Sequence, residues 1–151
     1  MIEMRKRARV AVIGGSRAAR EALGLAQETG RRLAEAGAVL ICGGLGGVME
    51  AAARGAKSAG GFTVGILPGS SPAEANASID LPVATGMGYT RNSLVVMNAD
   101  AVVAVDGEYG TLSEIAFALI HKKKVVGLAT WDIPGVIPAR DAEEAVRLVL
   151  G

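Results

Sequence analysis

Short aliphatic runs, each ended by glycine, alternate along this chain with stretches whose apolar residues recur at helical spacing. The first run covers residues 9–13 and stops at Gly14-Gly15-Ser16, after which helical spacing continues to Gly37. Uninterrupted aliphatic runs are typical of strands buried on both faces, as in a parallel sheet that helices cover. The alternation therefore predicts an α/β fold in which strand, glycine turn and helix repeat.

The pattern recurs often enough to predict a doubly wound, Rossmann-like parallel sheet of six or seven strands. The six strands that we expect cover residues 9–13, 38–42, 62–67, 81–85, 101–105 and 125–129. Their expected order is 3-2-1-4-5-6, which would place a ligand crevice between strands one and four. A length of 151 residues, 50% of them hydrophobic, suits one core, so residues 1–151 are predicted to form a single domain. Residues 70–80 are small and polar, and we expect them to form an irregular, mobile flap over the site.

Composition excludes several classes of function. The net charge of +1 lacks the basic excess of a nucleic-acid surface, and no apolar run approaches the ~20 residues of a membrane-spanning helix. The single cysteine cannot form an intrachain disulfide, and neither clustered histidines nor a second cysteine supplies a metal site. We therefore expect a cytoplasmic protein with no bound metal, no nucleic-acid partner and no membrane partner.

Four glycine-containing turns would emerge together at the carboxyl edge of this sheet, after strands one, two, four and five. A helix start carries unpaired N–H groups and partial positive charge, and glycine lets a ligand approach the backbone, so such turns bind phosphate. Neither a dinucleotide G-x-G-x-x-G fingerprint nor a Walker lysine is present. The fourth turn also carries Glu114, one helical turn inside the expected helix. The residues predicted to contact a phosphorylated small molecule are Gly14, Gly15, Ser16, Gly43, Gly44, Gly46, Gly47, Gly107, Gly110 and Thr111.

Three stretches together resemble a known family: residues 43–50 (GGLGGVME), Arg91-Asn92 and residues 107–114 (GEYGTLSE). They are similar to the Lonely guy (LOG) and molybdenum-cofactor-carrier group of Rossmann-like proteins, which are often mislabelled as lysine decarboxylases. The LOG signature is P-G-G-x-G-T-x-x-E with an upstream arginine, and the resemblance implies hydrolysis of the N-glycosidic bond of a nucleoside 5′-monophosphate. By position, Arg91 and Glu114 would be the catalytic pair.

The chain departs from the LOG signature at three positions. Asp106 stands where the enzymes have proline, Glu108 replaces the second glycine, and Asn92 stands where a lysine is usual. A carboxylate beside a phosphate site repels a dianion by about 1 kcal/mol when partly buried. The carrier-like relatives, which this chain resembles in its short length and its Gly-Val-Met-Glu run, imply binding of a phosphorylated pterin or nucleotide without cleavage.

We therefore predict a binding protein for a phosphate-bearing small molecule, either a nucleotide or a molybdopterin-type cofactor. The alternative is an active nucleoside 5′-monophosphate phosphoribohydrolase, in which Glu114 stabilises the oxocarbenium charge and Arg91 binds phosphate or polarises the departing base. A structural oligomer component without a ligand is a second alternative. A homo-oligomer, dimer or tetramer, is expected because family relatives are oligomers and because Leu94, Val95 and Met97 stand in one helix that a single buried face cannot absorb.

Three other residues have simpler interpretations. Ser16 either donates to phosphate or caps the first helix. Cys42 ends an apolar strand and is expected to be a small core residue near the ligand edge. His121 precedes three lysines at a helix end and is expected to be exposed there.

Overall fold

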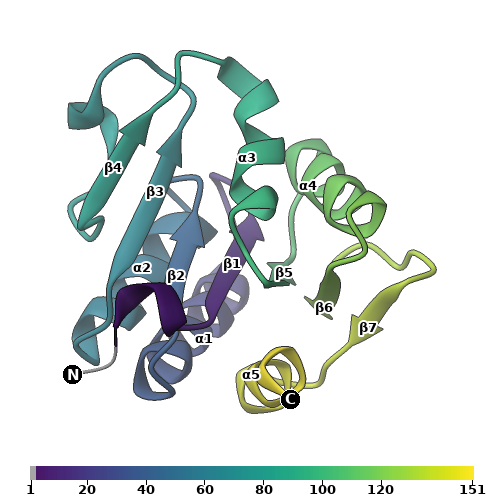
Figure 1. Cartoon of the computed structure of the whole chain (residues 1–151). Helices are drawn as coiled ribbons and strands as arrows, with labels where there is room; N and C mark the ends of the chain where they lie inside the picture. The colour runs from purple at the N-terminus through teal and green to yellow at the C-terminus, as the bar shows by residue number, and fades with distance from the viewer. Residues whose placement is uncertain (1–2) are drawn as a thin grey trace.

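The computed structural model describes residues 3–151, which form one parallel sheet with helices on both faces (Figure 1). The strands are β1 (Arg9–Gly14), β2 (Val39–Cys42), β3 (Thr63–Leu67), β4 (Leu81–Ala84), β5 (Ala101–Val105), β6 (Lys124–Leu128) and β7 (Val136–Pro138). The helices are α1 (Arg20–Glu35), α2 (Val48–Ser58), α3 (Asn92–Met97), α4 (Tyr109–Ile120) and α5 (Ala142–Leu150), with short 3-10 helices η1 (Met4–Lys6), η2 (Pro72–Glu74) and η3 (Gly88–Arg91). Across the sheet the strands follow the order β4-β3-β2-β1-β5-β6-β7.

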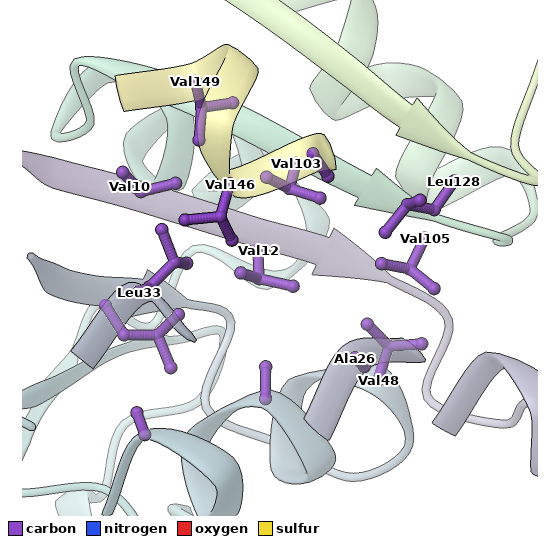
Figure 2. Packing of buried hydrophobic residues seen from close by; sticks show 14 of the residues in the cluster. Val10, Val12, Ala26, Leu33, Val48, Val103, Val105, Leu128, Val146 and Val149 are labelled. Atoms are coloured by element: carbon purple, nitrogen blue, oxygen red, sulfur yellow. The ribbon is translucent and has the colours of Figure 1, made fainter. Parts of the chain in front are cut away.

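Side chains of the central strands alternate between the two faces of the sheet, and each set meets its own helices. Val10, Val12 and Val103 pack with α1, α2 and α5 on one face (Figure 2). Ala11 and Val102 pack with α3 and α4 on the other. All five are no more than 1% exposed. The predicted α/β fold with a doubly wound parallel sheet is therefore confirmed.

Helices α1 and α2 approach each other backbone against backbone. A Cβ added at Gly30 of α1 would lie 1.9 Å from the carbonyl oxygen of Ala52. One added at Gly55 of α2 would lie 1.9 Å from the carbonyl oxygen of Gln27. Only glycine leaves room for such contacts, so the two helices form one tightly packed block on their face of the sheet.

The strand order agrees with the prediction in its 3-2-1 half, and the short fourth strand extends that half at the edge of the sheet. Because β4 pairs with β3, the neighbour of β1 on the other side is β5, and the switch in strand order lies between β1 and β5. The sequence explains this placement. Leu81 and Val83 are 49% and 37% exposed, and Pro82 lacks an N–H, which suits an edge strand. Strand β5 is buried throughout, as a central strand requires.

The loop between β3 and β4 is attached to the second glycine turn. Asn76 donates from its backbone N to the oxygen of Gly44 at 2.9 Å, and from Nδ2 to that of Leu45 at 2.8 Å. Thr63 Oγ1 donates to the Ser78 oxygen at 2.6 Å. The predicted flap is therefore anchored at the carboxyl edge through Asn76 and at the start of β3 through Ser78.

Burial tests three of the smaller predictions. Val95 is 0% exposed in the core, while Met97 is 46% exposed, so helix α3 leaves less apolar surface for a subunit contact than its sequence indicates. Cys42 is fully buried, and His121 is exposed at the end of α4, both as predicted. None of the helices between residues 3 and 151 combines the length and apolar character needed to cross a membrane.

Candidate functional site

Helices α1, α2 and α4 begin after the carboxyl ends of β1, β2 and β5, and no side chain caps them. Their N-cap residues, Ala19, Gly47 and Glu108, make no side-chain cap hydrogen bond. By contrast, the Asp141 side chain caps α5 by accepting from the Glu144 N–H at 2.9 Å. Uncapped helix starts carry free N–H donors and partial positive charge, so three of them at one edge attract an anion.

The first two glycine turns pack directly against each other. The Val48 N–H donates to the carbonyl oxygen of Gly15 at 3.0 Å, and a Cβ at Gly47 would lie 2.2 Å from the same oxygen. Ser16 follows in this contact and is exposed. Because Ala19 is the N-cap of α1, the alternative that Ser16 caps this helix is wrong.

Arg91 connects the third turn to the ends of β2 and β3. Its side chain is 6% exposed, donating from Nε to the Ile66 oxygen at 2.7 Å and from Nη2 to the Gly43 oxygen at 3.3 Å. Its Nη1 donates to the Asn92 Oδ1. These bonds use three of the five N–H donors of an arginine. Arg91 therefore holds strand ends together as well as bringing positive charge to the edge.

Asn92 connects the third turn to the fourth. Its side chain is buried, and Nδ2 donates to Ser113 Oγ at 3.2 Å and to the Gly110 oxygen at 3.4 Å. Ser113 Oγ in turn donates to the Gly110 oxygen at 2.6 Å. From the sequence, Asn92 was identified only as a departure from the LOG pattern, and its role in linking two turns was not predicted. Its position beside Arg91 was the only feature of the sequence that indicated this role.

The fourth turn has a backbone that requires glycine. Gly107 has a φ of 103°, and a Cβ there would lie 2.3 Å from Thr111 Oγ1. Thr111 is 2% exposed, and its side chain packs against Gly107. Its backbone belongs to the uncapped start of α4. Thr130 Oγ1 fixes the turn from the β6 side by donating to the Asp106 oxygen at 2.6 Å.

Steric need separates the glycines of these turns into two groups. At eight positions a side chain would collide with its surroundings or would need a left-handed backbone: Gly14, Gly15, Gly43, Gly44, Gly47, Gly86, Gly88 and Gly107. Gly46 and Gly110 have neither reason. A Cβ at Gly46 would meet only the Ser16 oxygen, at 3.6 Å, and one at Gly110 only Asn92 Nδ2, at 3.6 Å. The missing side chains at Gly46 and Gly110 leave the backbone open to an approaching ligand.

Two buried ionisable side chains, Glu114 and Arg91, lie behind the turns. Glu114 is 7% exposed, and burial raises the pKa of its carboxyl group to about 8 against the opposing attraction of Arg91. Burial likewise lowers the pKa of Arg91, against the attraction of Glu114. No Arg91 nitrogen lies within 4.0 Å of a Glu114 oxygen, so the two do not form a direct ion pair. Glu114 is therefore mostly neutral at pH 7 and able to donate a hydrogen bond.

The carboxyl group of Glu114 is buried without a hydrogen-bond partner among residues 3–151. Among the side-chain atoms of residues 3–151, only Arg7 Nε is both sealed from solvent and without a hydrogen-bond partner. The Glu114 oxygens have no partner either, but they are not sealed from solvent. Burial raises the pKa of the Cys42 thiol to about 12, and the nearby charges of Glu114 and Arg91 shift this pKa in opposite directions. The thiol is thus protonated and enclosed.

Two surface hollows lie away from these turns. One of about 450 Å³ is formed by α1 and the start of α5, and one of about 290 Å³ is formed near the start of β1. Neither hollow includes a residue of the glycine turns. Within residues 3–151, no group of three or more His, Cys, Asp or Glu side chains is placed to hold a metal ion.

Fold and site together define a Rossmann-like protein in which uncapped helix starts, glycine turns and a buried carboxyl group meet at one edge of the sheet. Residues 7–149 match the SLOG cluster4 family, and the chain belongs to that family. This match and the solved structures below confirm the resemblance to the LOG and molybdenum-cofactor-carrier group.

Similar proteins include two with solved structures. The molybdenum cofactor binding protein of Rippkaea orientalis is 34% identical, with a TM-score of 0.91 and coverage of 96% of both chains. The molybdenum cofactor carrier protein of Chlamydomonas reinhardtii is 34% identical, with a TM-score of 0.85 and coverage of 96% of this chain and 97% of the other. An uncharacterized protein of Archaeoglobus fulgidus is 48% identical over 119 residues, which are 79% of this chain and 78% of the relative.

Proposed function

We propose that this protein binds a phosphate-bearing small molecule, of the molybdopterin-cofactor or nucleotide type, at the carboxyl edge of its sheet. The observation that carries the proposal is the start of α4, where an uncapped helix meets an open backbone position at Gly110. The unpaired Glu114 carboxyl group behind it is a second, independent feature of a ligand site. The similarity to molybdenum cofactor carriers supports a cofactor as the ligand.

The groups at this edge suit a phosphate. The N–H donors at the starts of α2 and α4 would hold its oxygens, and the guanidinium group of Arg91 would add positive charge. A carboxylate at Glu114 would repel the phosphate, but burial keeps the group protonated below about pH 8. A molybdopterin-type ligand and a nucleotide both carry phosphate, so both match this part of the site.

Thermal unfolding in the presence of inorganic phosphate, AMP and a pterin monophosphate tests the proposal. A ligand at 100 times its Kd stabilises the native state by about 2.7 kcal/mol, which raises the Tm of a chain of this length by about 5–10 °C. Gly110→Ala should abolish that rise, because the new methyl group occupies the open position. Gly24→Ala is the matched control, since a Cβ at Gly24, on the exposed side of α1, meets nothing within 4 Å.

Two results would overturn the proposal. One is an equal rise in Tm for the parent protein and for Gly110→Ala. The other is the lack of a rise with any of the three probes, which is the outcome that a purely structural component predicts.

A nucleoside 5′-monophosphate phosphoribohydrolase is the second candidate, favoured by the meeting of Arg91 and Glu114 at one edge. A neutral carboxyl group is a poor stabiliser of oxocarbenium charge, so such an enzyme should speed up as pH rises through about 8. Incubation with AMP and with a cytokinin monophosphate, followed by chromatography for free base, distinguishes the candidates. Turnover that disappears in Glu114→Ala would replace the binding function with the enzymatic one.

We also propose self-association, as a dimer or tetramer. Met97 of α3 and Ile120 of α4 are 46% and 69% exposed, and the two helices are neighbours on one face of the sheet. Exposed apolar side chains on adjacent helices are typical of subunit contacts. Light scattering that gives the mass of one chain would contradict this proposal.

A further inference from the structure

An aromatic pair stands on the turn where the proposed phosphate site lies. Tyr109 is the first residue of α4, and its ring stacks on Trp131 with centroids 6.2 Å apart and planes inclined by 28°. Trp131 Nε1 donates to the carbonyl oxygen of Glu108 at 3.1 Å. Trp131 follows β6, far along the chain, yet it is fixed to the backbone of the same turn that carries Tyr109.

Tyr109 contributes little to the core. It is 81% exposed, although it occupies a position flanked by Glu108 and Gly110 beside the open backbone. Trp131 is half-buried and packs partly against the core, so it acts as a support for the tyrosine ring. A large ring that stacks on an anchored neighbour and is left open to solvent is suited to stacking on another planar ring.

Glu108 adds a selective group next to this ring. It is exposed, and its side chain does not cap α4, so its carboxylate is free of that intrahelical bond. A carboxylate accepts two parallel hydrogen bonds from an adjacent amino and ring N–H pair. Guanine and pterin both present such a pair on a 2-amino-4-oxo ring, in pyrimidine numbering, whereas adenine does not.

We propose that Tyr109, supported by Trp131, is the platform on which the ring of the ligand stacks, and that Glu108 selects a 2-amino-4-oxo ring. The inference rests on the proposed phosphate site, because the phosphate at the start of α4 would bring the ring to Tyr109. It also gives a role to a carboxylate that would otherwise only repel phosphate. The ligand class is then a guanine nucleotide or a phosphorylated pterin rather than a sugar phosphate.

Stacking of a base on an aromatic side chain should make ring-bearing ligands about 10- to 100-fold tighter than the same ligand without a ring. Calorimetry with ribose 5-phosphate, AMP, GMP and a pterin monophosphate measures this ratio and separates the two sources of the ring. Trp131 is the single tryptophan of the chain, so its fluorescence reports on the platform directly. A ring that stacks on Tyr109 should change this emission, whereas ribose 5-phosphate should not.

Three variants test the residues. Tyr109→Ala should bring the affinity for GMP and pterin monophosphate close to that for ribose 5-phosphate, while binding of ribose 5-phosphate stays within about 2-fold. Tyr109→Phe should retain the ring preference, because it keeps the stacking surface. Glu108→Gln should reduce the preference for GMP over AMP by about 10-fold.

The outcomes separate this inference from the function on which it rests. Equal affinities for GMP and ribose 5-phosphate in the parent protein would exclude the platform and leave the phosphate site intact. Failure of every probe to bind would remove both. If Tyr109→Ala instead lowers the mass measured by light scattering without changing the ring preference, Tyr109 belongs to a subunit contact and the platform is excluded.

Discussion

Replacing Glu114 by glutamine should make the stability of this protein less sensitive to pH. The carboxyl group holds its proton in the folded protein up to about pH 8, because burial disfavours the charged form. In the unfolded chain it ionises near 4.5. Between these values the unfolded state binds fewer protons than the folded state, so the stability that neutral Glu114 provides is complete below pH 4.5 and declines as pH rises toward 8. Glutamine has the same shape and does not titrate.

The size of the effect follows from the two pKa values. Each pH unit between 4.5 and about 8 costs the parent protein about 1.4 kcal/mol of unfolding free energy, so the loss between pH 5 and pH 7 is about 3 kcal/mol. Glu114→Gln should escape this loss. Its stability relative to the parent should therefore improve by about 3 kcal/mol over that interval, whatever its stability at pH 5.

Urea unfolding of both proteins at pH 5, 6, 7 and 8 measures this difference. Glu50→Gln is the matched control, because Glu50 stands in the first turn of α2 with a side chain that is 46% exposed. Its stability relative to the parent should change by less than about 0.5 kcal/mol over the same range. A free-energy difference between Glu114→Gln and the parent that does not vary with pH would refute the assignment of a neutral, buried carboxyl group.

Three further outcomes test other parts of the site. Gly110→Ala should leave the Tm unchanged or slightly higher. Gly107→Ala should instead lower the free energy of unfolding by about 1–3 kcal/mol, because the φ of 103° at this position is left-handed and the new Cβ would lie 2.3 Å from Thr111 Oγ1. Thermal melts compare the two variants. Arg91→Met should lose about 3 kcal/mol in urea unfolding, since two backbone carbonyls would lose their buried donor, and an unchanged midpoint would show that Arg91 does not hold the strand ends. Cys42 should react with a thiol reagent only as fast as the protein unfolds, because it is 0% exposed and its thiol pKa is about 12, and rapid labelling of the native protein would contradict its burial.

The sheet could be predicted from sequence because its central strands are covered on both faces and therefore read as unbroken aliphatic runs. The position of β4 could not be read in the same way. Its run is short and contains Pro82, and a rule for the commonest strand order placed it beside β1, whereas the structure pairs it with β3. Pro82 indicates an edge strand, but no local pattern tells at which edge of the sheet that strand lies.

The candidate site was predictable only where chemistry is local. Glycine turns and a helix-start acid are visible within a few residues of each other, so Gly107, Gly110 and Glu114 could be named. Hydrogen bonds between segments that lie far apart in the sequence could not be predicted. Asn92 reaches the fourth turn through a bond to Gly110, 18 positions later, and Trp131 reaches the same turn from beyond β6. Such contacts depend on how strands are ordered, which single residues do not encode.

The glycine contact between α1 and α2 gives the two sides of the ligand edge different stiffness. Gly30 and Gly55 bring backbones together without side chains that could change rotamer, so the turns that open into α1 and α2 should move as one rigid unit. The turns on the α3 and α4 side are joined instead by the side chain of Asn92. Side-chain hydrogen bonds can break and re-form singly. Ligands of different size should therefore be accommodated by movement of the α4 turn, and amide hydrogen exchange should be faster there than at the starts of α1 and α2.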